Sequence, residues 1–225
     1  GAVSFTDLFS MVTGLIGQHG RRGALMLTIA CDHPDLEEFM SVKTDLERVT
    51  KANMSIRVSD EFMECVRDRK PFLQKFDRPE SRQEIRKELD AAAFFEKLCY
   101  TNWDYGEPGC LYWDRISSWN LLSEFPNYSY AGTNPCAEEP LPAGGSCLLG
   151  SINLGAFVRD GVFQADEFKE TVRICVRGLN DVLDEGLPLH PLPEQRESVR
   201  NWRQIGLGSP TAHPTPWTSA TSSAG

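Results

Sequence analysis

This chain lacks several features that would assign it to a class of protein at once. Its 225 residues contain no Cys-x-x-Cys pair and no apolar run near the roughly 18 residues that a membrane span needs. The N-terminus shows no charged-then-apolar signal pattern. Histidine is scarce, with 4 copies, and suitably spaced Cys and His ligands for zinc do not occur. We therefore expect no membrane segment, no secretory leader and no metal site.

Basic charge is also scarce. The chain has 23 Lys and Arg against 32 Asp and Glu, a net charge of −9, which argues against nucleic-acid binding as its main function. Its 7 cysteines lie far apart and form no disulfide framework, so we expect a reducing compartment and a cytoplasmic protein. The chain begins at Gly1 without Met, as expected of an internal piece of a longer protein.

The hydrophobic pattern alternates between short strands and helices. Helical spacing of apolar residues predicts helices over 5–16, 36–40, 60–67, 91–100, 166–187 and 191–202. Short apolar runs predict strands over 24–30, 54–58, 111–113 and 152–158. The charge-dense residues 66–90 are interpreted as a solvated connection and a surface helix. This alternation favours an α/β architecture.

A change of composition separates residues 209–225 from the rest of the chain. The segment is rich in Ser, Thr, Pro and Ala and has no hydrophobic period. A disordered linker is the ordinary interpretation of such a segment. We favour a reading-frame error or a truncated gene, which would also leave a disordered tail. The organisation expected is one domain over 1–208 followed by this unrelated tail.

An unusual alternation of polar side chains occurs at residues 134–138. Asn134, Cys136 and Glu138 occupy every second position, and a second thiol, Cys147, follows. Prolines at 135, 140 and 142 favour an extended path over a helix. In an extended chain these three side chains would point to the same side.

The run 133–154 resembles the radical-site loop of ribonucleotide reductase large subunits. The pattern is Asn-x-Cys-x-Glu, a second Cys, and then Leu-Gly-Ser-Ile-Asn-Leu. Other blocks that look like this family follow in the expected order, at 20–26, 33–39, 43–45, 59–63, 106–109, 113–116 and 203–208. The resemblance covers residues 1–208 and implies a partial ten-stranded α/β barrel, with the Cys136 loop inserted as a finger.

The resemblance also implies a chemistry for each polar residue of the loop. Cys136 would be the thiyl that takes a hydrogen atom from the ribose, Glu138 the general base for the 3′-hydroxyl, and Asn134 the residue that orients the sugar. Cys147 would be one of two reducing thiols, and its partner is absent from this chain. The activity implied is reduction of ribonucleoside di- or triphosphates to deoxyribonucleotides for DNA synthesis.

The same resemblance implies a cofactor and several partners. The Asn-Pro-Cys-Ala-Glu-Glu-Pro-Leu-Pro wording looks most like the adenosylcobalamin-dependent class, and the alternative radical source is a metal-containing small subunit. The partners implied are a ribonucleotide substrate, dNTP or ATP effectors, a thioredoxin- or glutaredoxin-like reductant and a second copy in a homodimer. Residues 43–53 fall where the family has its specificity loop, which makes Glu47, Arg48, Lys51 and Asn53 candidates for base contacts.

Each assignment has an ordinary alternative. Cys136 and Cys147 could be small buried hydrophobes, Asn134 a turn-former before proline, and Glu138 a surface carboxylate. The loop 43–53 could be a plain polar loop. Residues 31, 65, 99, 110 and 175 are interpreted as core cysteines. For the whole chain the alternatives are a non-catalytic truncated remnant that only binds nucleotide or a partner, and a thiol-redox module in which Cys136 and Cys147 react with each other.

Overall fold

The computed structural model describes residues 1–18, 20–78 and 83–208, and the predicted tail at 209–225 lies outside these residues. The chain divides into two compact units, Gly1–Leu141 and Pro142–Gly225. The helices of the first unit are α1 Ser4–Leu15, α2 Leu36–Ser41, the 3₁₀ turn η1 Val42–Thr44, α3 Asp60–Asp68, α4 Ala91–Tyr105 and α5 Trp113–Ser118. Its strands are β1 Gly17–Gln18, β2 Arg21–Arg22, β3 Met26–Ala30, β4 Asn53–Val58, β5 Pro71–Arg78, β6 Gln83–Asp90, β7 Gly109–Tyr112, β8 Gly132–Thr133 and β9 Pro140–Leu141.

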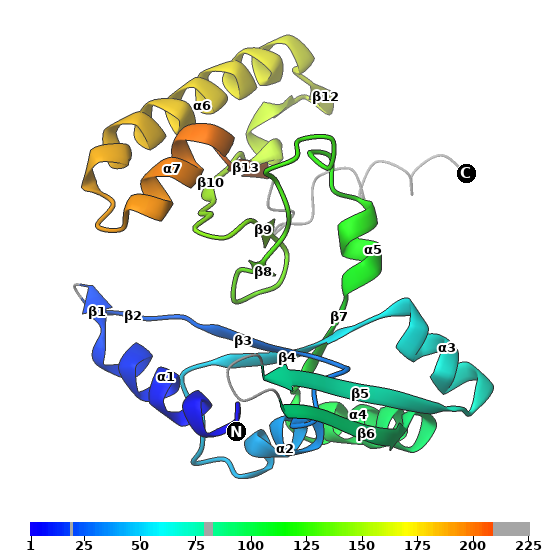
Figure 1. The fold of residues 1–225 in the computed structure, drawn as a ribbon. Helices are drawn as coiled ribbons and strands as arrows, with labels where there is room; N and C mark the ends of the chain where they lie inside the picture. Colours follow the sequence, from blue (N-terminus) through cyan, green and yellow to red (C-terminus); the bar gives the residue numbers. More distant parts are fainter. Residues whose placement is uncertain (19, 79–82, 209–225) are drawn as a thin grey trace, which may run out of the picture. The chain divides into compact units, whose positions relative to one another are not determined.

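A parallel sheet in the order β3-β4-β7 forms the centre of the first unit (Figure 1). On β4, alternate residues Met54, Ile56 and Val58 are at most 1% exposed and join the hydrophobic core with α2, α3 and α4. Because side chains alternate along a strand, Asn53, Ser55 and Arg57 lie on the opposite face. We call this second face the open face of the sheet.

Residues 66–90 contain a long antiparallel hairpin, so the predicted surface helix there is wrong. Strands β5 and β6 pair from Pro71 with Asp90 to Arg78 with Gln83. The directly paired Phe72 and Leu89 are both buried, whereas most of the charged side chains of the two strands are exposed. High charge density concealed this period of two, because only a few positions on each strand face the core.

The second unit pairs two parallel strands with two amphipathic helices. Its elements are β10 Leu148–Ser151, η2 Leu154–Phe157, β11 Val158–Arg159, β12 Val162–Phe163, α6 Ala165–Gly186, η3 Leu187–Leu189, α7 Pro193–Trp202 and β13 Ile205–Gly208. The strand predicted over 152–158 is wrong, since β10 ends at Ser151 and the Asn153 side chain accepts the Gly155 N–H to start a 3₁₀ turn. Helices α6 and α7 follow the predicted segments closely.

In residues 1–18, 20–78 and 83–208, no helix combines the length and the apolar character needed to cross a membrane.

The packing of aromatic rings in the core of the first unit predicts how a core substitution changes the free energy of unfolding. Phe62 is fully buried and meets Phe72 and Phe94 edge-on, with ring centroids 5.2 and 6.2 Å away. Phe62→Ala should therefore lower the free energy of unfolding by about 3–5 kcal/mol in urea denaturation, because it leaves a cavity among packed rings.

Leu73→Ala is the matched control, because Leu73 lies on β5 and is 52% exposed. Its expected change is within about 0.5 kcal/mol. A loss below about 1 kcal/mol for Phe62→Ala would contradict this packing.

Candidate active site

Cys136 lies at the tip of a tight turn that closes a small hairpin. Strands β8 and β9 pair antiparallel, and the turn over residues 134–139 joins them. The Asn134 N–H donates to the Glu139 carbonyl at 3.2 Å, and the Asn134 side-chain oxygen accepts the Glu139 N–H at 3.0 Å. The Ala137 N–H donates to the Asn134 carbonyl at 3.0 Å, and Ala137 has a φ of 67°. We call residues 134–139 the thiol turn.

This geometry corrects the expectation of an extended run with three side chains on one side. An Asn before Pro bonds readily to the backbone of its own turn, and the left-handed residue Ala137 reverses the chain. Asn134, Cys136 and Glu138 all belong to this turn, with Cys136 and Glu138 exposed and Asn134 half-buried. The turn-forming role considered for Asn134 is confirmed for its oxygen, while its amide nitrogen has no protein acceptor among the described residues.

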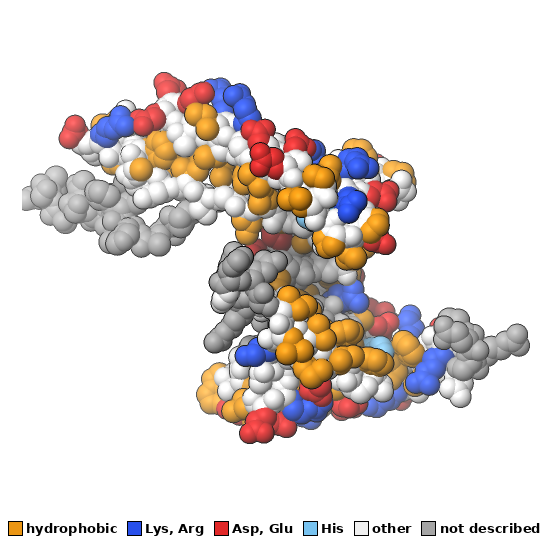
Figure 2. All heavy atoms as spheres, turned by 90° about the vertical axis from the view of Figure 1, so that its left-hand side faces the viewer, with side chains coloured by type: hydrophobic (Ala, Val, Ile, Leu, Met, Phe, Trp, Pro, Cys, Tyr) orange, Lys and Arg blue, Asp and Glu red, His pale blue; other side chains and the backbone are white. Residues whose placement is uncertain are grey.

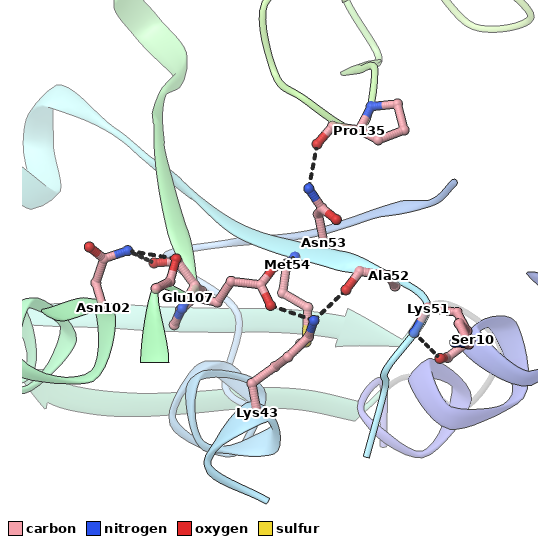
Figure 3. Close-up of polar contacts among 11 residues, drawn as sticks. Ser10, Lys43, Lys51, Ala52, Asn53, Met54, Asn102, Glu107 and Pro135 are labelled. Carbon is pink, nitrogen blue, oxygen red and sulfur yellow. Dashed lines mark hydrogen bonds and ion pairs between the residues drawn. The ribbon is translucent and has the colours of Figure 1, made fainter. Parts of the chain in front are cut away.

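The thiol turn lies against the first residues of β4. The Asn53 side-chain nitrogen donates to the Pro135 carbonyl at 2.9 Å (Figure 3). A cavity of about 240 Å³ opens here, and Cys136 and Ala137 line it together with Met26, Ser55 and Gly109. Gly109 lets β7 approach β4 closely here, because a Cβ at this position would lie 2.9 Å from the Ser55 Oγ and would force that hydroxyl to move. The sulfur of Cys136 therefore borders a cavity at the edge of the open face.

Two charged residues fix the backbone at this edge of the sheet. Glu107 forms an ion pair with Lys43, and its other oxygen accepts the Met54 N–H at 2.9 Å (Figure 3). The Asn102 side chain donates to the Gly106 and Pro108 carbonyls at 3.3 and 3.0 Å. The sequence indicated 106–109 only as part of the resemblance, and it placed Lys43 only at the start of the expected specificity loop. No local signal indicates this pair, because Lys43 has the opposite charge of Asp45 in its own block and Glu107 lies far away in the sequence.

Residues 43–53 are held against α1. The Arg48 guanidinium lies 2.5 Å from the Asp7 carboxylate, and hydrogen bonding to that carboxylate raises the pKa of Arg48. The Lys51 N–H donates to the Ser10 hydroxyl at 3.0 Å. Of the four predicted base-contact residues, Arg48 is paired, Lys51 is anchored by its backbone, Asn53 reaches the thiol turn and Glu47 is exposed.

The thiols of the first unit differ in accessibility. Cys31 is 3% exposed, and burial raises its pKa. Burial likewise raises the pKa of Cys110, which lines the same cavity as Cys136. Cys99 was interpreted as a core residue, but it is exposed on α4. Among the described residues of the cavity, Cys136 is thus the thiol that solvent and ligands reach most readily.

The family model "Ribonucleotide reductase, barrel domain" matches residues 1–215 of this chain. The chain belongs to this ribonucleotide reductase family. Similar relatives are the vitamin B12-dependent ribonucleoside-diphosphate reductases of Mycobacterium tuberculosis and Thermoplasma acidophilum, each 34% identical over 92% of this chain. The vitamin B12-dependent ribonucleotide reductase of Streptomyces coelicolor is 30% identical over the same share. The chain spans 29%, 27% and 24% of the length of these three relatives.

The ribonucleotide reductase residues predicted from the sequence fall in both units. Asn134, Cys136 and Glu138 share the thiol turn of the first unit. Cys147 belongs to the second unit and comes directly before β10, where it is half-buried. In residues 1–18, 20–78 and 83–208, no three His, Cys, Asp or Glu side chains are arranged to hold a metal ion.

Differences in thiol exposure lead to a labelling prediction. Iodoacetamide at pH 8 should alkylate Cys136 and Cys99 at least about tenfold faster than Cys31, because a buried thiol with a raised pKa is poorly accessible and rarely ionised. Mass spectrometry of tryptic peptides gives the rate for each residue. Equal rates for Cys136 and Cys31 would show that the thiol turn does not expose its sulfur.

Proposed function

We propose that this chain is part of the catalytic barrel of an adenosylcobalamin-dependent ribonucleotide reductase, which reduces ribonucleoside di- or triphosphates. The observation that carries the proposal is the exposed Cys136 on a braced turn, beside a cavity and with Asn134 and Glu138 in the same turn. The family match and the printed names of the relatives support it.

In this proposal the thiol turn supplies the groups that start the reaction. The Cys136 sulfur, as a thiyl radical, takes the hydrogen atom from C3′ of the ribose, and an S–H bond replaces the C–H bond. The Glu138 carboxylate accepts the proton of the 3′-hydroxyl, which helps the 2′-hydroxyl to leave as water with a proton from one of the two reducing thiols. Glu138 returns its proton to the 3′-oxygen at the end of the reaction. The free amide nitrogen of Asn134 donates to a ribose hydroxyl and orients the sugar.

The electrons for reduction come from a pair of thiols. Cys147 is one of them, and the second belongs to a part of the reductase outside this chain. Oxidation of both thiols to a disulfide delivers two electrons to the sugar, and Cys136 then returns its hydrogen atom to C3′. A thioredoxin- or glutaredoxin-like protein reopens the disulfide by thiol exchange.

The fit of adenosylcobalamin depends on access to one sulfur. Cys136 is exposed at the tip of its turn, and its thiol has no protein hydrogen-bond partner among the described residues. A bulky organic group can therefore reach this sulfur, and we assign Cys136 as the residue that meets it. When bound, adenosylcobalamin supplies the one-electron oxidising chemistry that Cys136 needs.

The parallel strands support the proposed barrel. A ten-stranded α/β barrel is built from parallel strands with helices outside, and both β3-β4-β7 and β10-β13 are parallel. The first sheet has helices packed on one face, and Asn53, Ser55 and Arg57 of β4 lie on the other, as expected for one wall of a barrel. We propose residues 1–208 as part of that barrel, with the thiol turn as its finger loop.

Helix α1 offers a surface for the proposed homodimer. Its residues Phe5, Leu8, Phe9, Val12 and Leu15 follow helical spacing, and all are more than 40% exposed. Figure 2 shows hydrophobic side chains gathered on the face that carries α1. A contiguous apolar stripe of this kind is typical of a protein interface, so we place the second copy there.

The dNTP or ATP effectors are proposed partners of the neighbouring residues 43–53.

The proposal is tested on the complete protein that contains this chain. With adenosylcobalamin and a dithiol, Cys136→Ser should abolish deoxynucleotide formation, because an alkoxyl radical cannot be formed in place of the thiyl. Cys99→Ser is the matched control, since Cys99 is the other exposed thiol of the first unit and should leave turnover unchanged. Substantial deoxynucleotide formation by Cys136→Ser would refute the proposed function.

The two roles of Asn134 can be separated by substitution. Asn134→Asp keeps an oxygen that accepts the Glu139 N–H but removes the amide donor, whereas Asn134→Ala removes both. We expect Asn134→Asp to leave the alkylation rate of Cys136 unchanged and to lower kcat/KM at least about tenfold. Asn134→Ala should change both quantities. If Asn134→Asp kept full activity, the amide nitrogen would have no role in substrate binding.

A further inference from the structure

We propose that Asn53 is a positioning residue, which sets the place of the Cys136 sulfur by holding the Pro135 carbonyl. The sequence suggested Asn53 only as a contact for a nucleotide base. Its side-chain nitrogen instead donates to the residue directly before Cys136, across 82 positions of sequence. The inference rests on the proposed function for the meaning of that position, but the contact itself does not depend on it.

Asn53 is well suited to this role because its own backbone is fixed from several sides. Its N–H donates to the Leu25 carbonyl at 2.8 Å, and it is the first β4 residue paired with β3. The next N–H, of Met54, donates to Glu107, and Lys43 neutralises that carboxylate (Figure 3). Met54 is 1% exposed in the core. The Asn53 side chain therefore projects from a rigid strand end.

The thiol turn needs such a support. Its other hydrogen bonds are local: Asn134 bonds with Glu139, Ala137 donates to Asn134, and the Thr133 hydroxyl of β8 donates to the Asn134 carbonyl at 3.0 Å. They fix the shape of the hairpin but not its place on the sheet. The hydrogen bond from Asn53 joins the turn to the sheet that lines the cavity. Pro135 has no N–H of its own to give, so its carbonyl is the backbone group that it offers to the sheet.

The position of the Cys136 sulfur should affect the rate of the reaction more than it affects the affinity for the substrate. Hydrogen-atom transfer requires near contact between sulfur and C3′, and a misplacement of about 1 Å can cost about 100-fold in rate. Asn53 lines the same cavity as Cys136, but in this proposal it does not hold the substrate. Its loss should therefore lower kcat and leave KM almost unchanged.

Asn53→Asp is the sharpest variant, because it has the same shape and replaces the donor nitrogen by an oxygen that repels the Pro135 carbonyl. In the complete protein we expect kcat to fall at least about tenfold while KM changes less than about twofold. Asn53→Gln keeps an amide donor on a longer stem and should recover part of the lost kcat.

Alkylation with iodoacetamide gives a readout that needs no reductase activity. The rate at Cys136 should change at least about threefold in Asn53→Asp. The rate at exposed Cys99 should stay the same, and buried Cys31 should stay protected, which shows that the fold is intact.

An unchanged Cys136 rate in Asn53→Asp would overturn the positioning role, whatever the activity. A changed rate with unchanged kcat would also overturn it. Failure of the proposed function is seen separately, as activity in Cys136→Ser, and leaves the alkylation result valid.

Discussion

The two-sided character of β4 is the constraint on which the site depends. Met54, Ile56 and Val58 must face the core, so Asn53, Ser55 and Arg57 must face away from it. A slip of one residue in the pairing with β3 would exchange the two sets and bury an amide and a guanidinium among aliphatic side chains. The hydrophobic core thus fixes the register of β4, and this register places the Asn53 side chain in contact with the thiol turn.

A reactive thiol has two requirements that conflict. It must be exposed to meet a substrate, and it must be held in place to react with one particular hydrogen atom. The structure reconciles them by bracing the backbone on both sides of Cys136, through Pro135 to Asn53 and through Asn134 to Glu139. The buried thiol Cys31 and the half-buried thiol Cys110 show the opposite arrangement, in which burial raises the thiol pKa and limits access.

Sequence reasoning succeeded where a local pattern decides the structure. Helices α4, α6 and α7 carry clear helical periods, and strands β3 and β4 lie in short apolar runs. Ser59 caps α3 by accepting the Phe62 N–H at 3.1 Å. It failed where partners distant in sequence decide. The charged hairpin β5–β6 becomes a sheet only because each strand pairs with the other. The Lys43–Glu107 pair and the Asn53–Pro135 contact join segments that no period connects.

The parallel sheets have a practical consequence for handling this chain. Within the described residues, β3 and β7 each pair only with β4, and β10 and β13 pair only with each other. Each of the edge strands β3, β7, β10 and β13 therefore has one side without a strand partner. The free N–H and C=O groups of such an edge can pair with another copy of the chain. We therefore expect the isolated chain to aggregate in solution. Co-expression with segments that pair with these edge strands should keep it soluble better than a change of buffer.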